Sequence, residues 1–197
     1  MRTSKLLLTA SVVGVLIVFV TIQAQQKANN GAHTVATLTA QDYLDIQQLV
    51  NRYAFAIDTC SNNGYDYADL YTPDGVFYWG VGARKSVGRE ELAEAAGGGK
   101  LGCQKLAGAT PEKPVATHVT VNLVIDPSPQ GATGKSYLVY PGVQGIHADP
   151  NHSGHVGGYQ DVYVKTSRGW RFKSRLHVFP PLIPGTVDIG EVEKQAH

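Results

Sequence analysis

The sequence has 197 residues, of which 43% are hydrophobic, and its formal net charge is +1. This length allows one folded domain with a substantial core. A net charge near zero, without a basic run or a base-stacking motif, argues against a nucleic-acid partner.

The N-terminal segment, residues 1–24, is predicted to be an export signal. Two basic residues precede an apolar run over residues 6–20, which is short for a membrane-spanning helix. Cleavage after Ala24 is expected, although Ile22 is larger than the residue usually found at such a site. We therefore expect a periplasmic or secreted protein, and the alternative is a membrane-anchored protein that keeps this segment. Residues 25–37 are predicted to be a flexible lead-in.

A long amphipathic helix is predicted from Thr39 to Asp58. Thr39 and Asp42 form a capping-box pattern at its start. Asp58 stands at the other end, where unpaired carbonyl groups disfavour a carboxylate, so it is a candidate functional residue. The alternative is that Asp58 opens the polar turn that follows. Apolar residues recur at steps of three and four and predict one buried stripe, formed by Tyr43, Ile46, Val50, Tyr53 and Ile57.

The sequence contains two cysteines, Cys60 and Cys103. Export would place both in an oxidising compartment, and each follows a predicted helix. We predict a disulfide between them, which closes a loop of about 40 residues and stabilises the fold by about 2–4 kcal/mol. Two buried free thiols are the alternative.

The middle of the chain predicts short elements and one long loop. A short helix is expected over residues 65–71, a turn over 72–75, a strand over 76–80 and a second helix over 86–96. The glycine-rich loop 97–114 carries no phosphate-binding pattern, because its glycines neither follow a strand nor open a helix.

The second half of the chain predicts four strands. They are expected at residues 116–126, 134–143, 156–165 and 170–179, and a tight hairpin joins the last two. Helices followed by an antiparallel meander indicate an α+β fold. This domain is expected to span residues 38–184, and the tail over 185–197 is expected to be irregular.

Strict alternation along the strand at 116–126 predicts two different faces. Helices that cover the face of His118 would enclose a polar-lined pocket and leave the apolar row for a second subunit. Helices that cover the apolar row would leave His118 exposed, and periodicity alone does not decide between these arrangements. The apolar row is Val119, Val121, Leu123 and Ile125, opposite His118, Thr120 and Asn122. On the last strand, Trp170, Phe172, Leu176 and Val178 are expected opposite Arg171, Lys173, Arg175 and His177.

Four motifs and the order of the elements resemble the SnoaL-like branch of the nuclear-transport-factor-2-like (NTF2-like) superfamily. The motifs are NRYAFAID, ATHVTVNLVID, TGKSYLVY and GGYQDVYVKTSRGWRFKSRLHV, and the resemblance spans residues 38–179. It implies a cone in which N-terminal helices pack on a strongly curved, mostly antiparallel sheet and enclose a pocket. It also implies a homodimer formed through the sheet. The superfamily includes bile-acid dehydratases, scytalone dehydratase, polyketide cyclases and binding proteins without chemistry.

The resemblance is closest to the bile-acid dehydratase pattern, and it implies which residues are catalytic. The tyrosine and aspartate five residues apart match Tyr53 and Asp58, and the strand histidine matches His118. The second acid of that pattern is replaced here by Tyr140, which removes a carboxylate but keeps a proton-bearing group. Taken alone, Tyr53 would be a core residue and His118 a strand histidine satisfied by a neighbour or by water.

Such a site implies enolate chemistry on a small apolar carbonyl compound, such as a polyketide, steroid or terpenoid. An aspartate that orients His118 makes it a base for a proton next to the carbonyl. Tyr53 and Tyr140 would donate hydrogen bonds to the enolate oxygen. Neither a metal nor an organic cofactor is expected. The alternative function is non-catalytic small-molecule binding or assembly.

Further polar residues are weaker candidates. His177 and Arg175 could meet an anionic group at the pocket mouth, although a solvated or interface face is the alternative. The histidines of the loop and Asp149 suggest a metal, but their spacing fits no established ligand motif. The substrate-binding candidates are Asn122, Tyr159, Asp161 and His177, and the loop histidines are His147, His152 and His155.

Overall fold

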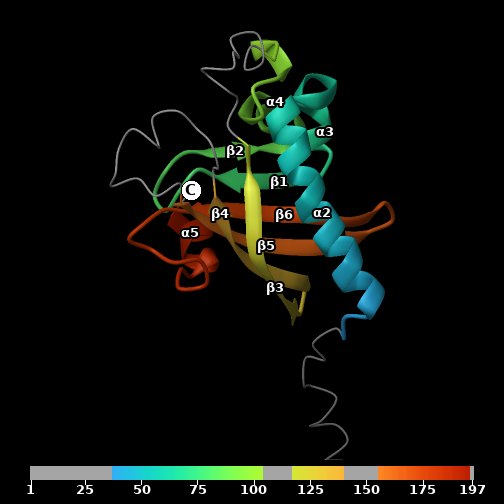
Figure 1. Cartoon of the computed structure of the whole chain (residues 1–197), viewed down its shortest axis with the longest axis vertical. Helices are drawn as coiled ribbons and strands as arrows, with labels where there is room; N and C mark the ends of the chain where they lie inside the picture. Colours follow the sequence, from blue (N-terminus) through green and yellow to red (C-terminus); the bar gives the residue numbers. More distant parts are fainter. Residues whose placement is uncertain (1–36, 104–116, 140–154, 196–197) are drawn as a thin grey trace, which may run out of the picture. The chain divides into compact units, whose positions relative to one another are not determined.

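The computed structural model describes residues 37–103, 117–139 and 155–195 (Figure 1). The chain divides into two units, Met1–Val35 and Ala36–His197, and every described residue belongs to the second. The predicted export signal therefore lies outside the described residues. No helix in the described part is long and apolar enough to cross a membrane.

The second unit combines helices with one six-stranded sheet, as the α+β prediction required. The strand order is β2-β1-β6-β5-β4-β3, and neighbouring strands are antiparallel except β1 and β6, which are parallel. The helical elements are α2 (Ala40–Thr59), α3 (Tyr65–Ala68), α4 (Gly88–Ala95), α5 (Ile189–Gln195) and the 3-10 turns η1 (Ser61–Gly64) and η2 (Gly99–Leu101). The strands are β1 (Tyr71–Tyr78), β2 (Lys85–Val87), β3 (Val119–Ser128), β4 (Gly131–Val139), β5 (His155–Thr166) and β6 (Gly169–Val178).

Helix α2 begins with the predicted capping box. The Thr39 side chain accepts a hydrogen bond from the Asp42 backbone N–H, and the Asp42 carboxylate accepts one from the Thr39 N–H. The buried face is wider than the predicted stripe, and Tyr43 is 39% exposed, which contradicts its predicted burial. The buried residues of α2 are Asp42, Ile46, Leu49, Val50, Tyr53, Ala56 and Ile57.

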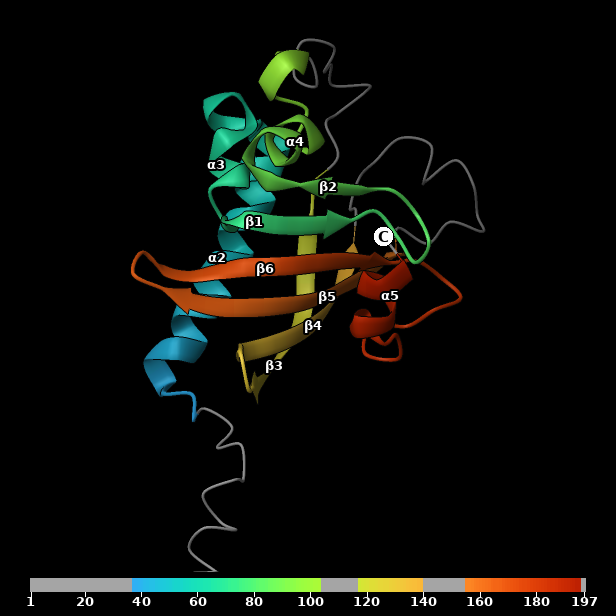
Figure 2. The same ribbon diagram turned by 180° about the vertical axis from the view of Figure 1, so that it is seen from behind.

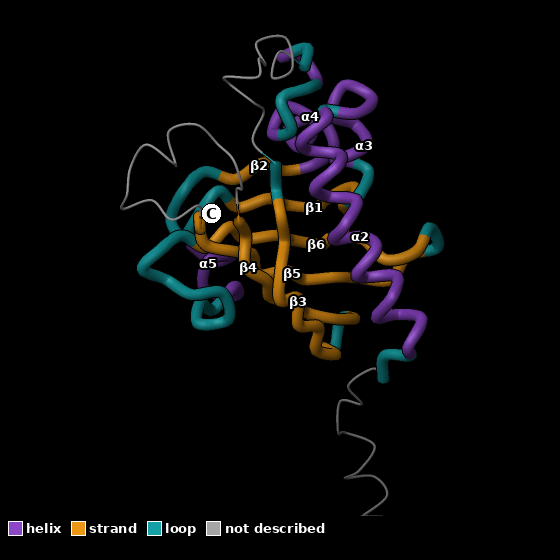
Figure 3. The backbone as a smooth tube through the Cα atoms, in the orientation of Figure 1, coloured by secondary structure: helices purple, strands orange, loops and turns teal. Residues whose placement is uncertain are grey.

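The sheet is strongly bent, so that β3 runs crosswise to β1 and β6 (Figure 1). The view from behind places α2 and β3 on the same side of β1, β6 and β5 (Figure 2). Helices α3 and α4 gather beside β1 and β2 at one end of the sheet (Figure 3). The space between α2 and the sheet is filled by an aromatic cluster that includes Tyr53, Tyr67, Tyr71, Tyr159, Tyr163 and Phe172.

A bulge in β3 overturns the strict alternation predicted for this strand. Between Val121 and Val124, β3 advances three residues while β4 advances two, and Asn122 in between has a left-handed φ of 55°. An extra residue reverses which face the following side chains occupy. The predicted apolar row is therefore split. Val119 and Val121 are exposed, whereas Leu123 and Ile125 pack against the core on the α2 side.

A second bulge lies in β6 and changes the faces of its residues in the same way. Moving away from the turn that joins β5 and β6, Tyr163 pairs with Phe172, and the next residue of β5, Val162, pairs with Ser174. Lys173 is therefore an extra residue in β6. Arg175 is consequently buried on the same side of the sheet as Phe172, where it packs against that ring. The prediction that Arg175 and His177 face away from Phe172 is wrong. Leu176 instead packs on the opposite side of the sheet, in a second small core.

The C-terminal tail also differs from its prediction as an irregular segment. It contains helix α5, whose Val192 is buried against Tyr78, Leu176 and Val178. These apolar contacts explain why the tail is ordered, because they remove its hydrophobic side from water. The turn predicted over residues 72–75 lies within β1, where the pairing with β6 is interrupted.

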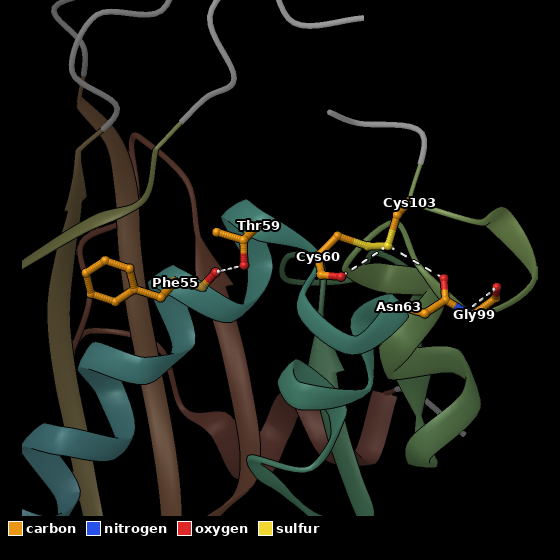
Figure 4. The surroundings of a disulfide bond; sticks show 6 residues. All are labelled: Phe55, Thr59, Cys60, Asn63, Gly99 and Cys103. Atoms are coloured by element: carbon orange, nitrogen blue, oxygen red, sulfur yellow. Dashed lines mark hydrogen bonds between the residues drawn. A yellow bond between two sulfur atoms is a disulfide. The ribbon is translucent and has the colours of Figure 1, made fainter. Parts of the chain in front are cut away.

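The predicted disulfide between Cys60 and Cys103 is present and joins the end of α2 to the segment after η2 (Figure 4). The two Cα atoms are 5.8 Å apart, and the cysteines are separated by 43 positions in the sequence. Nearby, the Asn63 side-chain amide donates a hydrogen bond to the Gly99 carbonyl at 3.0 Å. The C-terminal end of α2 is thus fixed to a segment far along the chain.

Candidate functional site

Asp58 and His118 are in direct contact through two hydrogen bonds. One Asp58 carboxylate oxygen is 2.5 Å from Nδ1 of His118, and the other accepts the His118 backbone N–H at 2.9 Å. Asp58 lies in the last turn of α2, and His118 immediately precedes β3. The two side chains are only 15% and 12% exposed. The Asp58 carboxylate at the end of α2 therefore binds a residue next to the sheet that lies 60 positions later in the sequence.

This contact determines which nitrogen of neutral His118 carries the basic lone pair. When Asp58 accepts a hydrogen bond from Nδ1, the neutral imidazole carries its lone pair on Nε2. A proton taken up by Nε2 gives an imidazolium next to the Asp58 carboxylate, which stabilises the positive charge. The backbone N–H of His118 holds the second carboxylate oxygen, so the pair is oriented at two points.

Tyr53 lies beside this pair, in the interior between α2 and the sheet. The Tyr53 side chain is fully buried, and its ring makes a T-shaped contact with the His118 ring, with the ring centroids 6.1 Å apart. The Tyr53 hydroxyl donates a hydrogen bond to the Tyr159 hydroxyl at 3.1 Å. Burial raises the pKa of Tyr53. Tyr53 therefore remains a neutral hydroxyl donor at physiological pH.

Asp161 and Arg175 form a fully buried ion pair on the adjacent strands β5 and β6. Nε and Nη2 of Arg175 donate to the two Asp161 carboxylate oxygens at 2.7 and 2.8 Å, and Tyr163 donates its hydroxyl at 2.7 Å. Burial acts to lower the pKa of Arg175, but the Asp161 carboxylate outweighs burial and holds that pKa well above its ordinary value. Asp161 is thus a partner for Arg175 and Tyr163.

The Arg175 guanidinium is enclosed by aromatic rings. Its central carbon lies 4.0 Å from the ring centre of Tyr53, 4.2 Å from that of Tyr159 and 4.3 Å from that of Phe172. Nη1 of Arg175 is buried and has no hydrogen-bond partner in the described part of the chain. A buried donor of this kind is a ready partner for a ligand oxygen. The sequence did not predict the burial of Arg175, because the bulge at Lys173 is not visible in an alternating pattern.

The structure brings together most, but not all, of the predicted site residues. Tyr159 and His177 stack with centroids 5.2 Å apart, and the His177 ring also stacks on Phe179 at 3.9 Å, with His177 only 8% exposed. Asn122 is exposed at the β3 bulge, and no hydrogen bond between it and these groups is found. Tyr140 lies outside the described residues.

The predicted metal candidates cannot be placed within the described part. His147, Asp149 and His152 lie outside it, and of His155 only the backbone, at the start of β5, is described. Among residues 37–103, 117–139 and 155–195, no group of three or more histidine, cysteine, aspartate or glutamate side chains is positioned to hold a metal ion.

Comparison with known proteins relates this geometry to a family and a fold. The SnoaL-like domain family matches residues 38–176. No curated protein shows significant similarity to the sequence. A protein of unknown function from Mycobacterium tuberculosis superposes with a TM-score of 0.55 at 23% identity, covering 80% of this chain and 96% of the other.

Two further solved structures share the fold. An NTF2-like protein with a cystatin-like fold from Novosphingobium aromaticivorans gives a TM-score of 0.54 at 17% identity, covering 80% of this chain and 90% of the other. ActVI-ORFA from Streptomyces coelicolor gives a TM-score of 0.50 at 16% identity, covering 71% and 98%. At these identities the likeness establishes the fold alone.

Proposed function

The chain belongs to the SnoaL-like domain family, and from this premise we propose that it is a cofactor-independent lyase or isomerase of a small apolar carbonyl compound. The observation that carries the proposal is the two-point contact between Asp58 and His118 beside buried Tyr53. It joins an oriented base to neutral and charged hydrogen-bond donors in an aromatic environment. This combination suits a reaction that removes a proton and develops negative charge on an oxygen.

The proposed reaction begins with proton removal by His118. Nε2 takes a proton from the carbon next to the substrate carbonyl, and the electrons of the C–H bond move onto the carbonyl oxygen to give an enolate. Asp58 stabilises the imidazolium that forms. The proposed donors to the enolate oxygen are Nη1 of Arg175, which is buried without a partner in the described part, and the Tyr53 hydroxyl, which would turn its O–H from Tyr159 to the substrate.

The enolate then collapses in one of two ways. In a dehydration, the electrons return to form a carbon–carbon double bond, and a hydroxyl on the next carbon leaves as water after it receives the proton from His118. In an isomerisation, His118 returns the proton to a different carbon. Both outcomes restore neutral His118 and consume no oxidant or reductant. The substrate class is apolar because the surroundings are dominated by tyrosine and phenylalanine rings.

Ligand binding without chemistry is the second candidate, and a specific observation favours it. Asp161, the carboxylate nearest to Tyr163 and Arg175, accepts hydrogen bonds from both and is committed to them. It therefore does not replace the second acid that the dehydratase pattern provides. A group of residues with one oriented histidine and several hydroxyl groups can hold a carbonyl compound by hydrogen bonding alone.

Incubation with a panel of carbonyl compounds separates the two functions. The panel contains a 3-ketosteroid, an aromatic β-hydroxyketone and a cyclic terpenoid enone, and products are followed by mass spectrometry and NMR. An enzyme converts at least one compound, and its His118→Ala variant binds the same compound without converting it. Recovery of every bound compound unchanged by the wild-type protein would contradict the lyase or isomerase proposal and support binding.

We also propose that the protein forms a homodimer through the outer face of β3 and β4. Val119, Val121, Val124 and Tyr137 are each 37–44% exposed on these strands, which leaves apolar surface for a second copy. Sedimentation should give a dimer mass at micromolar concentration, and Val121→Asp should shift it toward the monomer. A wild-type monomer under these conditions would contradict the proposal.

Export remains a proposal as well, supported by the Cys60–Cys103 disulfide, because such bonds persist mainly in oxidising compartments. N-terminal sequencing of the protein recovered from its host tests the predicted cleavage after Ala24. A mature chain beginning at residue 25 in the periplasm or medium supports export. An intact N-terminus in the cytoplasm would contradict it.

A further inference from the structure

A groove of about 730 Å³ opens on another side of α2, and none of Tyr53, Asp58 and His118 lines it. One wall is formed by α2, and the other comes from the segment before β1 and the turn between β5 and β6. The lining includes Leu49, Arg52 and Phe55 on α2, Leu70 before β1, and Arg168 and Arg171 at the hairpin.

Three arginines from three separate segments line this groove. Arg52 comes from α2, Arg168 from the β5–β6 turn and Arg171 from β6. Within the described residues, the side chains of Arg52 and Arg168 have no ion pair or hydrogen bond. Nη1 of Arg171 donates a hydrogen bond to the neighbouring Trp170 carbonyl at 2.7 Å. Nε of Arg171 is buried and has no hydrogen-bond partner in the described residues. The groove therefore holds N–H donors that have no acceptor in the described part of the chain.

The arginines are close enough to repel one another. Burial lowers the pKa of Arg171, and the positive charges of Arg168 and Arg52 lower it further, whereas the Asp69 carboxylate acts to raise it. Asp69 partly compensates this positive charge, and an anion bound between the guanidinium groups would compensate it further.

Three acidic residues, Asp45, Asp66 and Asp69, also line the groove, and Asp69 partly balances the charges of Arg168 and Arg171. Asp69 accepts two hydrogen bonds from Arg89, at 2.7 and 3.0 Å, so its charge is already paired with a fourth arginine. Asp45 accepts a hydrogen bond from Gln41 at 2.7 Å. Asp66 also lines the groove, in the first turn of α3.

The groove also has an apolar part. Leu49, Ala56 and Trp170 are buried at its base, and Phe55 is 75% exposed beside them. Figure 4 shows the Phe55 ring directed away from the disulfide. A ligand bound here would cover this aromatic ring, whose exposure to water is unfavourable.

We propose that the groove binds a small amphipathic carboxylate. Its carboxylate meets the guanidinium groups of Arg52, Arg168 and Arg171, whose planar N–H pairs match the two oxygens. Its apolar body lies over Phe55 and Leu49. The site is separate from the proposed catalytic residues, so it is independent of the proposed function.

The test uses the full chain and two matched probes, naphthylacetate and the neutral alcohol naphthylethanol, followed by fluorescence titration. The test variant is Arg52→Gln/Arg168→Gln, because both side chains are exposed and their removal breaks no ion pair among the described residues. The control variant is Arg84→Gln, an exposed arginine that stacks on Trp79 outside the groove. The His118→Ala variant tests whether naphthylacetate binds at the interior site near His118 instead of in the groove.

The wild-type protein and Arg84→Gln are expected to bind naphthylacetate equally, and the double variant about tenfold or more weakly. Naphthylethanol is expected to bind all of them weakly. The proposal is overturned if the wild-type protein shows no saturable binding of naphthylacetate, or if the double variant binds it as tightly as the wild type. It is also overturned if the alcohol binds as well as the acid, or if His118→Ala alone abolishes binding.

Discussion

The two ends of helix α2 each carry an aspartate, and their partners differ in kind. Near the start, Asp42 accepts hydrogen bonds from the Thr39 N–H and hydroxyl at 2.9 and 2.7 Å, from Lys165 at 2.6 Å and from Trp170 at 2.9 Å. At the end, Asp58 is held by the backbone and the ring of His118. One carboxylate ties the helix to the hairpin, and the other contacts a titratable side chain.

The helix dipole favours the first arrangement and opposes the second. A carboxylate in the first turn stabilises a helix, whereas one in the last turn faces unpaired carbonyl groups. The Lys165 side chain, followed by Thr39, holds the pKa of Asp42 well below its ordinary value. Asp58 lies at the less favourable end of the helix, where its carboxylate binds His118. A locally unfavourable choice that creates an oriented base is what a functional site would require.

The largest expected effect is a difference in turnover between variants of the two aspartates. Asp58→Asn should lower turnover of a converted carbonyl compound by about 10²–10⁴-fold, because the amide no longer stabilises the imidazolium of His118. Asp42→Asn should leave the turnover of the folded protein close to wild type. Steady-state kinetics at 25 °C on both variants checks this, with circular dichroism to confirm folding. Equal losses in both variants would remove the distinction.

Removal of the disulfide should have the next largest effect, which acts at the C-terminal end of α2. Cys60→Ser/Cys103→Ser should lower the free energy of unfolding by about 2–4 kcal/mol, because the unfolded chain regains the freedom of a long closed loop. Denaturant unfolding measures the change. A double variant as stable as the wild type would show that the other contacts suffice to fix this end.

The pH dependence of stability tests the N-terminal end. The pKa of Asp42 is lowered in the folded protein, so its contribution is present above the unfolded value of about 4 and is lost as the pH falls through the lower folded value. Wild-type Tm should therefore exceed that of Asp42→Asn near neutral pH, and the difference should shrink below about pH 4. A difference that stays constant between pH 7 and pH 2 would contradict this assignment.

The smallest effect concerns the cap itself. Thr39→Ala should lower the free energy of unfolding by about 1 kcal/mol, because the Asp42 N–H loses its side-chain acceptor. Thr39→Ser keeps that acceptor and serves as the matched control. Urea unfolding of the two variants measures the difference, and an equal loss in both would show that the methyl group rather than the hydroxyl matters.

Much of this helix was predictable because its signals are local. The capping box of Thr39 and Asp42 follows from residue spacing, and the disulfide from the cysteine count and its expected compartment. The further bonds of Asp42 to Lys165 and Trp170 were not predictable, since they join residues more than a hundred positions apart.

The sheet shows where periodicity fails. The meander of the last four strands was predicted, whereas strand β2 and the parallel pairing of β1 with β6 were not. The bulges at Asn122 and Lys173 also reverse the faces of the residues beyond them. Asn122 gives a weak signal, since asparagine tolerates a left-handed φ more readily than most residues do. Lys173 gives none, and the burial of Arg175 against Asp161 therefore had no counterpart in the alternating pattern. The predicted Asp58–His118 partnership came from family resemblance, and the structure places the two in contact.

The most direct measurement of the proposed chemistry is deuterium exchange into a bound carbonyl compound. The wild-type protein and His118→Ala are incubated in deuterium oxide with a 3-ketosteroid that both bind, and NMR follows the hydrogens next to the carbonyl. If Asp58 and His118 form a working base, the wild-type protein exchanges these hydrogens faster than buffer, and His118→Ala exchanges them at the buffer rate. Exchange at the buffer rate by the wild-type protein, or equally fast exchange by both, would contradict a catalytic role for the pair.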